Sequence, residues 1–214
     1  MIRLHHVPQA RSFRILWLLE ELGLPFEVAE HSFFDKSLRD EAYAMLSPAG
    51  RVPALEIEGR AIFESGAITQ WLCEREGALL GAPDERVDWL QWLHFAETIA
   101  AHVANLTQQH IALREDWMRS PTVMRLEAAR LARTLTVVER GLAGDYLLPS
   151  GFSAVDIAVS YGAMIGQRFT PLDPFPRLRD WLGRLGDRPA FQRALARDGA
   201  AQIYTRPFYP APEA

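Results

Sequence analysis

The 214-residue sequence contains a single cysteine, Cys73. One cysteine excludes a disulfide framework, a C-x-x-C redox pair and a cysteine-rich zinc site, and it is typical of a reducing compartment. The sequence has no run of Lys or Arg, and 23 basic against 27 acidic residues give a net charge of −4. Nucleic acid and anionic membranes are therefore poor candidates for partners. No stretch approaches about eighteen consecutive apolar residues, and residues 1–6 lack the apolar core of a signal peptide. We expect a cytoplasmic protein that binds neither nucleic acid nor a membrane.

The order of predicted elements indicates two domains. With 49% hydrophobic and 23% charged residues the composition is that of a globular protein, and the length suffices for two small domains. Residues 77–83, with two glycines and a proline, interrupt the pattern and are the best candidate linker. Strands and helices alternate before this segment, whereas the chain beyond it is helical. The predicted domains are residues 1–80, of the α/β class, and residues 81–214, all helical.

Hydrophobic spacing predicts the elements of the first domain. Residues 2–7 and 26–31 alternate as strands around a helix over 15–22, which implies two parallel strands joined by a right-handed crossover. Residues 52–57 and 60–63 are typical of an antiparallel hairpin, and a helix follows from about Ser65.

Apolar residues at helical spacing dominate the second part of the chain. One helical run begins near Trp89 and extends as far as Trp117, and Ser120 precedes the next helix. Ser153 and Asp156 form a capping-box pattern at the start of a third helix, in which Asp replaces the usual Glu or Gln. Two further helices are predicted over residues 176–185 and 189–197.

Ser12 lies where the opening strand gives way to the first helix. The first amides of a helix lack intrahelical partners and the helix dipole is positive there, so an anion is favoured. A serine hydroxyl beside these amides can donate a hydrogen bond to a negatively charged sulfur or oxygen of a ligand. The alternative interpretation is an ordinary helix N-cap.

The histidines and the cysteine suggest no metal site. The histidine spacings are not those of a metal site, so we expect no bound metal. Cys73 falls inside the predicted helix after Ser65, where a buried, unreactive core thiol is the better interpretation.

Five segments, in the same order and at similar separations, resemble the soluble glutathione transferases, especially bacterial and fungal members. They cover nearly the whole chain and comprise RSFRILWLLEELGLP at 11–25, RVPAL at 51–55, FESGAI at 63–68, FSAVDI at 152–157 and, over 176–191, PRL, a tryptophan and RPAF. The resemblance implies a thioredoxin-like N-terminal domain, an all-α C-terminal domain that contributes an electrophile pocket, and a homodimer. It also implies glutathione as co-substrate, and Ser12 lines up with a serine that many members place at this helix start.

The same resemblance assigns residues to glutathione. It implies a cis bond between Val52 and Pro53, so that the Val52 backbone pairs with the cysteinyl part of the tripeptide. Glu64 is then a candidate for the γ-glutamyl ammonium group, Ser65 for its carboxylate, and Arg51 for a carboxylate. Lys36 and Arg39 are weaker candidates for the glycyl carboxylate. Without the resemblance, Glu64 and Ser65 are equally well explained as a strand-end charge and a helix cap.

The expected function is transfer of the glutathione thiolate, stabilised by Ser12, to an apolar electrophile. One alternative is glutathione-dependent reduction of peroxides or disulfides. Another is a binding module that keeps this fold without catalysis. The sequence does not distinguish the second substrate, because residues of such a pocket follow no recognisable code.

Overall fold

The computed structural model describes residues 1–142 and 144–213, which form two compact units. The first unit comprises Met1–Leu80 together with Gly186–Gln202, and the second comprises Gly81–Leu185 together with Ile203–Ala214. Among the described residues, no helix combines the length and the apolar character needed to cross a membrane.

The first unit is built on a four-stranded mixed sheet. Its strands are β1 (Ile2–His6), β2 (Phe26–Glu30), β3 (Ala54–Ile57) and β4 (Arg60–Phe63), in the order β2-β1-β3-β4. β1 and β2 are parallel, with Ile2 opposite Phe26, while β3 runs antiparallel to both β1 and β4. The predicted parallel pair and the predicted hairpin are therefore confirmed.

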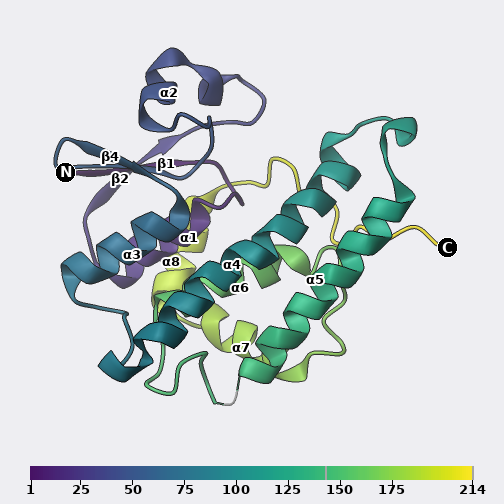
Figure 1. The fold of residues 1–214 in the computed structure, drawn as a ribbon. Coiled ribbons are helices and arrows are strands. Elements are labelled where there is room, and N and C mark those ends of the chain that lie inside the picture. Colours follow the sequence, from purple (N-terminus) through teal and green to yellow (C-terminus); the bar gives the residue numbers. More distant parts are fainter. Residues whose placement is uncertain (143, 214) are drawn as a thin grey trace. The chain divides into compact units, whose positions relative to one another are not determined.

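Helices cover both faces of this sheet. α1 (Phe13–Glu21) and α3 (Ser65–Glu76) lie on one face, and α2 (Glu41–Leu46), preceded by the 3-10 turn η1 (Ser37–Arg39), lies on the other (Figure 1). The core under α1 and α3 consists of fully buried aliphatic side chains from the sheet and both helices, among them Leu4, Ile15, Leu16, Leu19, Leu55, Ile68 and Leu72. Cys73 of α3 is buried and forms no disulfide, as predicted for a core thiol.

A helix from the far end of the chain completes the first unit. α8 (Pro189–Asp198) packs against α1, where Phe191 lies edge-on to Phe13 and Trp17 with ring centroids 5.7 and 4.9 Å apart. Arg188 forms a bidentate ion pair with Glu21, with distances of 2.6 and 2.8 Å. A bidentate pair of this kind fixes the relative orientation of the two side chains as well as the distance between them. The division into domains at 1–80 and 81–214 stays a prediction. α8 comes from the C-terminal part of the chain but packs against α1 of the first unit.

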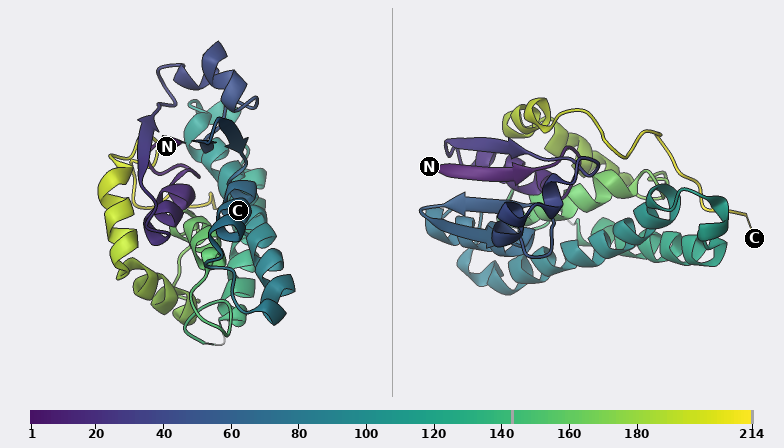
Figure 2. Two further views of the ribbon diagram at one scale, coloured as in Figure 1. Left: turned by 90° about the vertical axis from the view of Figure 1, so that its left-hand side faces the viewer. Right: turned by 90° about the horizontal axis from the view of Figure 1, so that it is seen from above.

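The second unit is a set of packed helices. It contains η2 (Pro83–Glu85), α4 (Arg86–Thr107), α5 (Pro121–Gly141), α6 (Ala154–Gly166) and α7 (Pro176–Gly186, except its last residue). α4 and α5 run side by side (Figures 1 and 2), and α4 also packs closely on α6, where a Cβ added at Gly162 would lie 2.8 Å from Ile99 Cγ2. Glycine is therefore needed at that contact.

The prediction of one helical run to Trp117 is wrong. α4 ends at Thr107 and continues as a π-helical turn, η3 (Gln108–Ala112), followed by a separate 3-10 turn, η4 (Asp116–Met118). Apolar spacing alone does not distinguish an α-helical turn from a π turn, because both keep side chains on one face over so short a stretch.

The predicted capping box at the start of α6 is confirmed. Asp156 Oδ2 accepts the backbone N–H of Ser153 at 2.9 Å, and its Oδ1 accepts Leu147 N–H and Trp181 Nε1–H, each at 3.0 Å. The carboxyl group is completely buried, and burial raises its pKa while these hydrogen bonds oppose the increase. One carboxylate thus joins α6, the preceding loop and α7.

Replacement of Asp156 tests how much its hydrogen bonds contribute to the free energy of unfolding. Asp156→Ala leaves three buried donors without an acceptor, so we expect a loss of about 2–4 kcal/mol in the free energy of unfolding. Asp156→Asn keeps one acceptor oxygen and should lose less. Urea denaturation followed by tryptophan fluorescence measures both, with the exposed Asp173→Ala as control. A loss below about 1 kcal/mol for Asp156→Ala would contradict the assignment.

Candidate functional site

The first component of the site is the start of α1, where Ser12 is completely buried. Its hydroxyl accepts the N–H of Val7 at 3.2 Å and donates to the carbonyl of Val7 at 3.3 Å. Ser12 has helical backbone angles, and its side chain makes no capping hydrogen bond to the helix. The side chain therefore closes the loop between β1 and α1 rather than capping α1.

The positive end of α1 retains an unused donor. The N–H groups of Phe13 and Arg14 bond to the carbonyls of Ala10 and Arg11. In the part of the chain that the structure describes, the N–H of Ser12 has no hydrogen-bond partner. This unpaired amide and the helix dipole favour an anion at the position that the sequence indicated.

A carboxylate at the end of α8 holds the loop that leads to Ser12. Asp198 is buried, and its carboxylate accepts the N–H of Gln9 at 3.0 and 3.2 Å. Its Oδ1 also lies 3.2 Å from Nε2 of the buried His6. Gln9 has a φ of +56°, a conformation that non-glycine residues seldom adopt without external support. Sequence reasoning missed Asp198, because nothing in its neighbourhood indicates a contact with a loop 189 residues earlier.

The second component is the segment before β3. The Val52–Pro53 peptide bond is cis, as the resemblance implied. The side chain of Val52 is buried. Across the described residues neither its backbone N–H nor its carbonyl has a protein partner. The segment thus offers one donor and one acceptor to an extended peptide.

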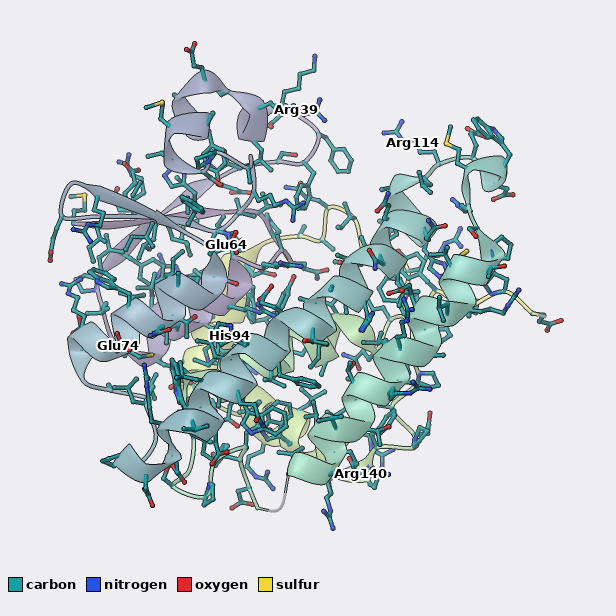
Figure 3. All side chains as sticks on the ribbon, in the orientation of Figure 1. Arg39, Glu64, Glu74, His94, Arg114 and Arg140 are labelled. Carbon is teal, nitrogen blue, oxygen red and sulfur yellow. The ribbon has the colours of Figure 1, made fainter. Side chains whose placement is uncertain are left out.

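The third component is the start of α3. Glu64 is exposed, lies at the amino end of the helix (Figure 3) and has a φ of +71°. For the described part of the molecule, the first three amides of α3, those of Ser65, Gly66 and Ala67, have no hydrogen-bond acceptor. An unfavourable backbone angle beside a row of open donors is typical of a binding site.

A buried arginine connects the two helix starts. Arg14, in the first turn of α1, donates from Nη1 to the hydroxyl of Ser65 at 3.2 Å. The structure therefore brings the starts of α1 and α3 together at one end of the sheet. Because Ser65 Oγ accepts this bond, its own O–H remains able to donate to an incoming carboxylate.

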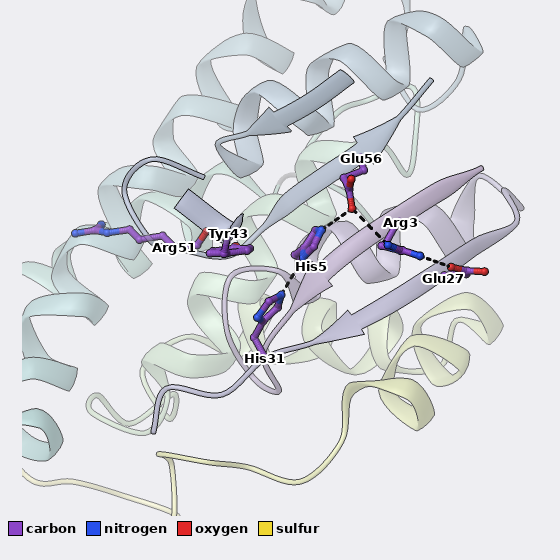
Figure 4. Close-up of polar contacts among 7 residues, drawn as sticks. All are labelled: Arg3, His5, Glu27, His31, Tyr43, Arg51 and Glu56. Atoms are coloured by element: carbon purple, nitrogen blue, oxygen red, sulfur yellow. Dashed lines mark hydrogen bonds and ion pairs between the residues drawn. The ribbon is translucent and has the colours of Figure 1, made fainter. Parts of the chain in front are cut away.

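The basic candidates lie on the surface of the first unit. Arg51, Lys36 and Arg39 are all exposed. The Arg51 side chain extends away from Tyr43 and the neighbouring histidines (Figure 4). Its backbone carbonyl, in contrast, accepts hydrogen bonds from the hydroxyls of Tyr43 and Ser47. No group of three or more His, Cys, Asp or Glu side chains in residues 1–142 and 144–213 is arranged to hold a metal ion.

The two units define a class of protein, a thioredoxin-like domain extended by a helical region. Residues 1–74 match the family model described as the N-terminal domain of glutathione S-transferase. A glutathione S-transferase-like protein of Beauveria bassiana, OpS6, is 30% identical over 91% of this chain and 94% of its own length. The chain belongs to the glutathione S-transferase family.

Further relatives extend this similarity. Glutathione S-transferase 3 of Schizosaccharomyces pombe is 28% identical over 100% of this chain and 98% of its own length. The disulfide-bond oxidoreductase YfcG of Escherichia coli is 26% identical over 91% of this chain and 94% of its own length. Among solved structures, a glutathione transferase of Pseudomonas putida with one glutathione disulfide bound per subunit has a TM-score of 0.81 and 27% identity, with 92% of each chain covered.

The pH dependence of stability provides a test of the polar groups beside this site. Burial, followed by the charge of His5, lowers the pKa of His31 below its ordinary value of 6.5, although Asp35 opposes the shift. The unfolded chain therefore binds a proton at this histidine more readily than the folded protein. Its contribution to stability is complete above about pH 7 and is lost as pH falls from 6.5 through the lower folded-state pKa.

His31→Gln removes this titration. We expect the free energy of unfolding of the variant to decline less steeply than that of the wild type between about pH 7 and about pH 5. Urea denaturation at several pH values measures the slopes, and the exposed His94→Gln serves as control. Identical slopes for the His31 variant and the wild type would show that the histidine does not titrate as described.

Proposed function

We propose that this protein binds glutathione and transfers its thiolate to an apolar electrophile. The observation that supports this most directly is the set of unpaired backbone donors at Ser12, at Val52 and at the start of α3. A thiol tripeptide with two carboxylates and an extended backbone has the complementary acceptors. All three groups lie within the unit of the chain that matches the N-terminal domain of the family.

In this proposal the sulfur of glutathione is the nucleophile. A free thiol has a pKa of about 8.5, so only a few per cent is ionised near pH 7. The unpaired amide at the start of α1 and a hydrogen bond from Ser12 together lower the thiol pKa by about one to two units. The thiolate then forms a carbon–sulfur bond with the electrophile, and the electron pair of the broken bond departs with the leaving group.

Ser12 must exchange one acceptor for another to take this role. Its hydroxyl donates to the Val7 carbonyl over 3.3 Å, at the long and weak end for an O–H donor. A thiolate is a charged acceptor, and hydrogen bonds to charged groups are about twice as strong as neutral ones. Rotation of the hydroxyl toward the sulfur is therefore favourable once glutathione binds, while the Val7 N–H keeps its bond to Ser12 Oγ.

The remaining candidates recognise the rest of the tripeptide. Val52, ahead of Pro53, pairs through its N–H and carbonyl with the cysteinyl residue. Ser65 and the amides that follow it bind the γ-glutamyl carboxylate, and Glu64 binds the ammonium group. Arg51, exposed beside this segment, binds a carboxylate of the ligand, and Lys36 or Arg39 binds the glycyl carboxylate.

The proposal extends to the rest of the molecule. The helical residues 81–214 supply the electrophile pocket, and residues 1–80 the glutathione site. Two copies form a homodimer, as the family resemblance implies. A cytoplasmic location agrees with the single, buried cysteine.

Ser12→Ala tests the mechanism. We expect turnover to fall at least about tenfold and the pKa of bound glutathione to rise by about one unit, because one charge-assisted hydrogen bond is lost. Glutathione affinity should change little. Turnover is measured with an aryl halide, and the thiol pKa by the ultraviolet absorbance of the thiolate.

Ser160→Ala is a matched control for this variant. Ser160 is also completely buried and donates to a backbone carbonyl at 3.3 Å, but it lies in α6. Its loss should leave turnover and the thiol pKa unchanged. If turnover and the thiol pKa are unchanged in Ser12→Ala as well, Ser12 has only a structural role, that of closing the loop between β1 and α1.

Glutathione-dependent reduction is the second candidate function. The relative YfcG is named a disulfide-bond oxidoreductase, and the Pseudomonas putida transferase structure contains glutathione disulfide. In this alternative the same thiolate attacks a disulfide or a peroxide, breaking the S–S or O–O bond and expelling a thiolate or an alkoxide. A second glutathione then attacks the sulfur of the glutathione adduct, which releases the remaining thiol or water and forms glutathione disulfide. No protein cysteine is needed, and Cys73 is buried.

A substrate panel separates the candidates. We expect turnover with aryl halides and other apolar electrophiles to exceed turnover with a hydroperoxide and with a mixed disulfide of glutathione. The opposite ranking would assign the protein to the reductases. If calorimetry detects no binding at millimolar glutathione, the protein is a non-catalytic module with this fold.

A further inference from the structure

A buried pair of hydroxyl groups holds the peptide that precedes Val52. Tyr43 Oη and Ser47 Oγ both donate to the Arg51 carbonyl, at 2.8 and 2.7 Å, and Ser47 Oγ accepts the Arg51 N–H at 3.3 Å. Tyr43 belongs to α2 and Ser47 is the residue at its C-terminal end, and both are nearly inaccessible to solvent. Two donors on one loop carbonyl are more than the structure needs to satisfy that group.

The direction of the Arg51 carbonyl determines the direction of the Val52 N–H. The two groups belong to one planar peptide unit, and in a trans peptide they point to opposite sides. The only cis bond in the described chain follows Val52, so the Arg51–Val52 bond is trans. By drawing the Arg51 carbonyl toward α2, the two hydroxyls turn the Val52 N–H away from α2, and that N–H has no protein partner among the described residues.

We infer that Tyr43 and Ser47 are positioning residues for glutathione, which orient the Val52 N–H toward the cysteinyl backbone of the tripeptide. This inference rests on the proposed function and deepens it. Neither side chain touches the ligand in this arrangement, because both act through the Arg51 carbonyl. Their effect is on binding of the tripeptide backbone, not on ionisation of its sulfur.

The ring of Tyr43 lies against two histidine rings, and these belong to a chain of hydrogen-bonded polar side chains (Figure 4). Its centroid lies 4.6 Å from the ring of His31 and 5.4 Å from that of His5. His5 Nδ1 and His31 Nε2 share a hydrogen bond of 2.8 Å, and His5 Nε2 lies 2.9 Å from Oε1 of Glu56 on β3. Side chains from β1, β3 and the end of β2 thus limit the positions that the Tyr43 ring can take.

The Tyr43 hydroxyl is in the protonated form that a hydrogen-bond donor requires. Burial raises its pKa to about 12, and the neighbouring Ser47 hydroxyl opposes this increase only in part. At neutral pH the group is therefore protonated, as donation to a carbonyl requires. Tyr43 also belongs to a cluster of buried residues that includes Leu38, Val7 and Ala54.

Tyr43→Phe removes the hydroxyl and keeps the ring. We expect the dissociation constant for glutathione, measured by calorimetry, to rise about threefold to tenfold, as loss of one hydrogen bond predicts. Turnover at saturating glutathione and the pKa of the bound thiol should stay at wild-type values. Tyr146→Phe, a tyrosine of the second unit that packs edge-on against Phe152, is the matched control.

Two substitutions of Ser47 test the positioning role without altering the side chain of Tyr43. Ser47→Ala should also weaken glutathione binding, and the double variant with Tyr43→Phe should weaken it more than either change alone. Ser47→Thr restores the hydroxyl and should bind nearly as the wild type does. A change in turnover or in thiol pKa that equals the change in affinity would contradict a positioning role.

The outcomes distinguish this inference from the function on which it rests. If the wild type binds glutathione while Tyr43→Phe and Ser47→Ala bind it equally well, the positioning role is overturned and the proposed function stands. Lower thermal stability with unchanged affinity has the same meaning, because it makes the two hydroxyls purely structural. If the wild type itself does not bind glutathione, both the proposed function and this inference fail.

Discussion

The first unit depends on one constraint, namely that a backbone N–H group removed from water needs an acceptor. Among the described residues, backbone N–H groups without a protein partner occur at the buried residues Ser12 and Val52 and at the start of α3, where Ser65 is buried and Ala67 is exposed. An unsatisfied buried donor costs about 1–3 kcal/mol, so these positions are where an external acceptor gains most. Each lies where one regular element ends and another begins, since only there is the backbone free of its own ladder or helix.

Side chains from elsewhere in the first unit hold these junctions in place. Asp198 of α8 supports the loop before Ser12, and Arg14 of α1 reaches the hydroxyl of Ser65. Tyr43 of α2 holds the peptide before Val52. All three are buried, and a buried polar group is tolerated only when it is hydrogen-bonded. The candidate binding surface is therefore made of backbone groups, and buried side chains hold those groups in place.

In the proposed function, the features that identify the family and the features that select the electrophile belong to different parts of the chain. Similarity along almost the whole chain identifies it as a member of the glutathione S-transferase family, and in the proposed function a backbone surface built by the fold and by a few short motifs recognises the tripeptide. The proposal assigns the choice of electrophile to side chains of the helical residues instead, and one fold can accommodate many different pockets. Accordingly, the relatives that align with this chain include proteins named as transferases and one named as a disulfide-bond oxidoreductase.

Local patterns in the sequence determined most of the fold. Alternation and helical spacing predicted the parallel pair β1–β2, the hairpin β3–β4 and the capping box at Ser153 and Asp156, because each depends on neighbours within a few residues. Only the tertiary structure decided that α8 packs on α1, that α4 ends at Thr107, and that the Ser12 hydroxyl bonds to Val7. It alone brought Asp198 to the loop before Ser12 and Tyr43 to the peptide before Val52. Hydrogen bonds between side chains and loops remote in sequence depend on how whole elements pack, and no short-range periodicity records that packing.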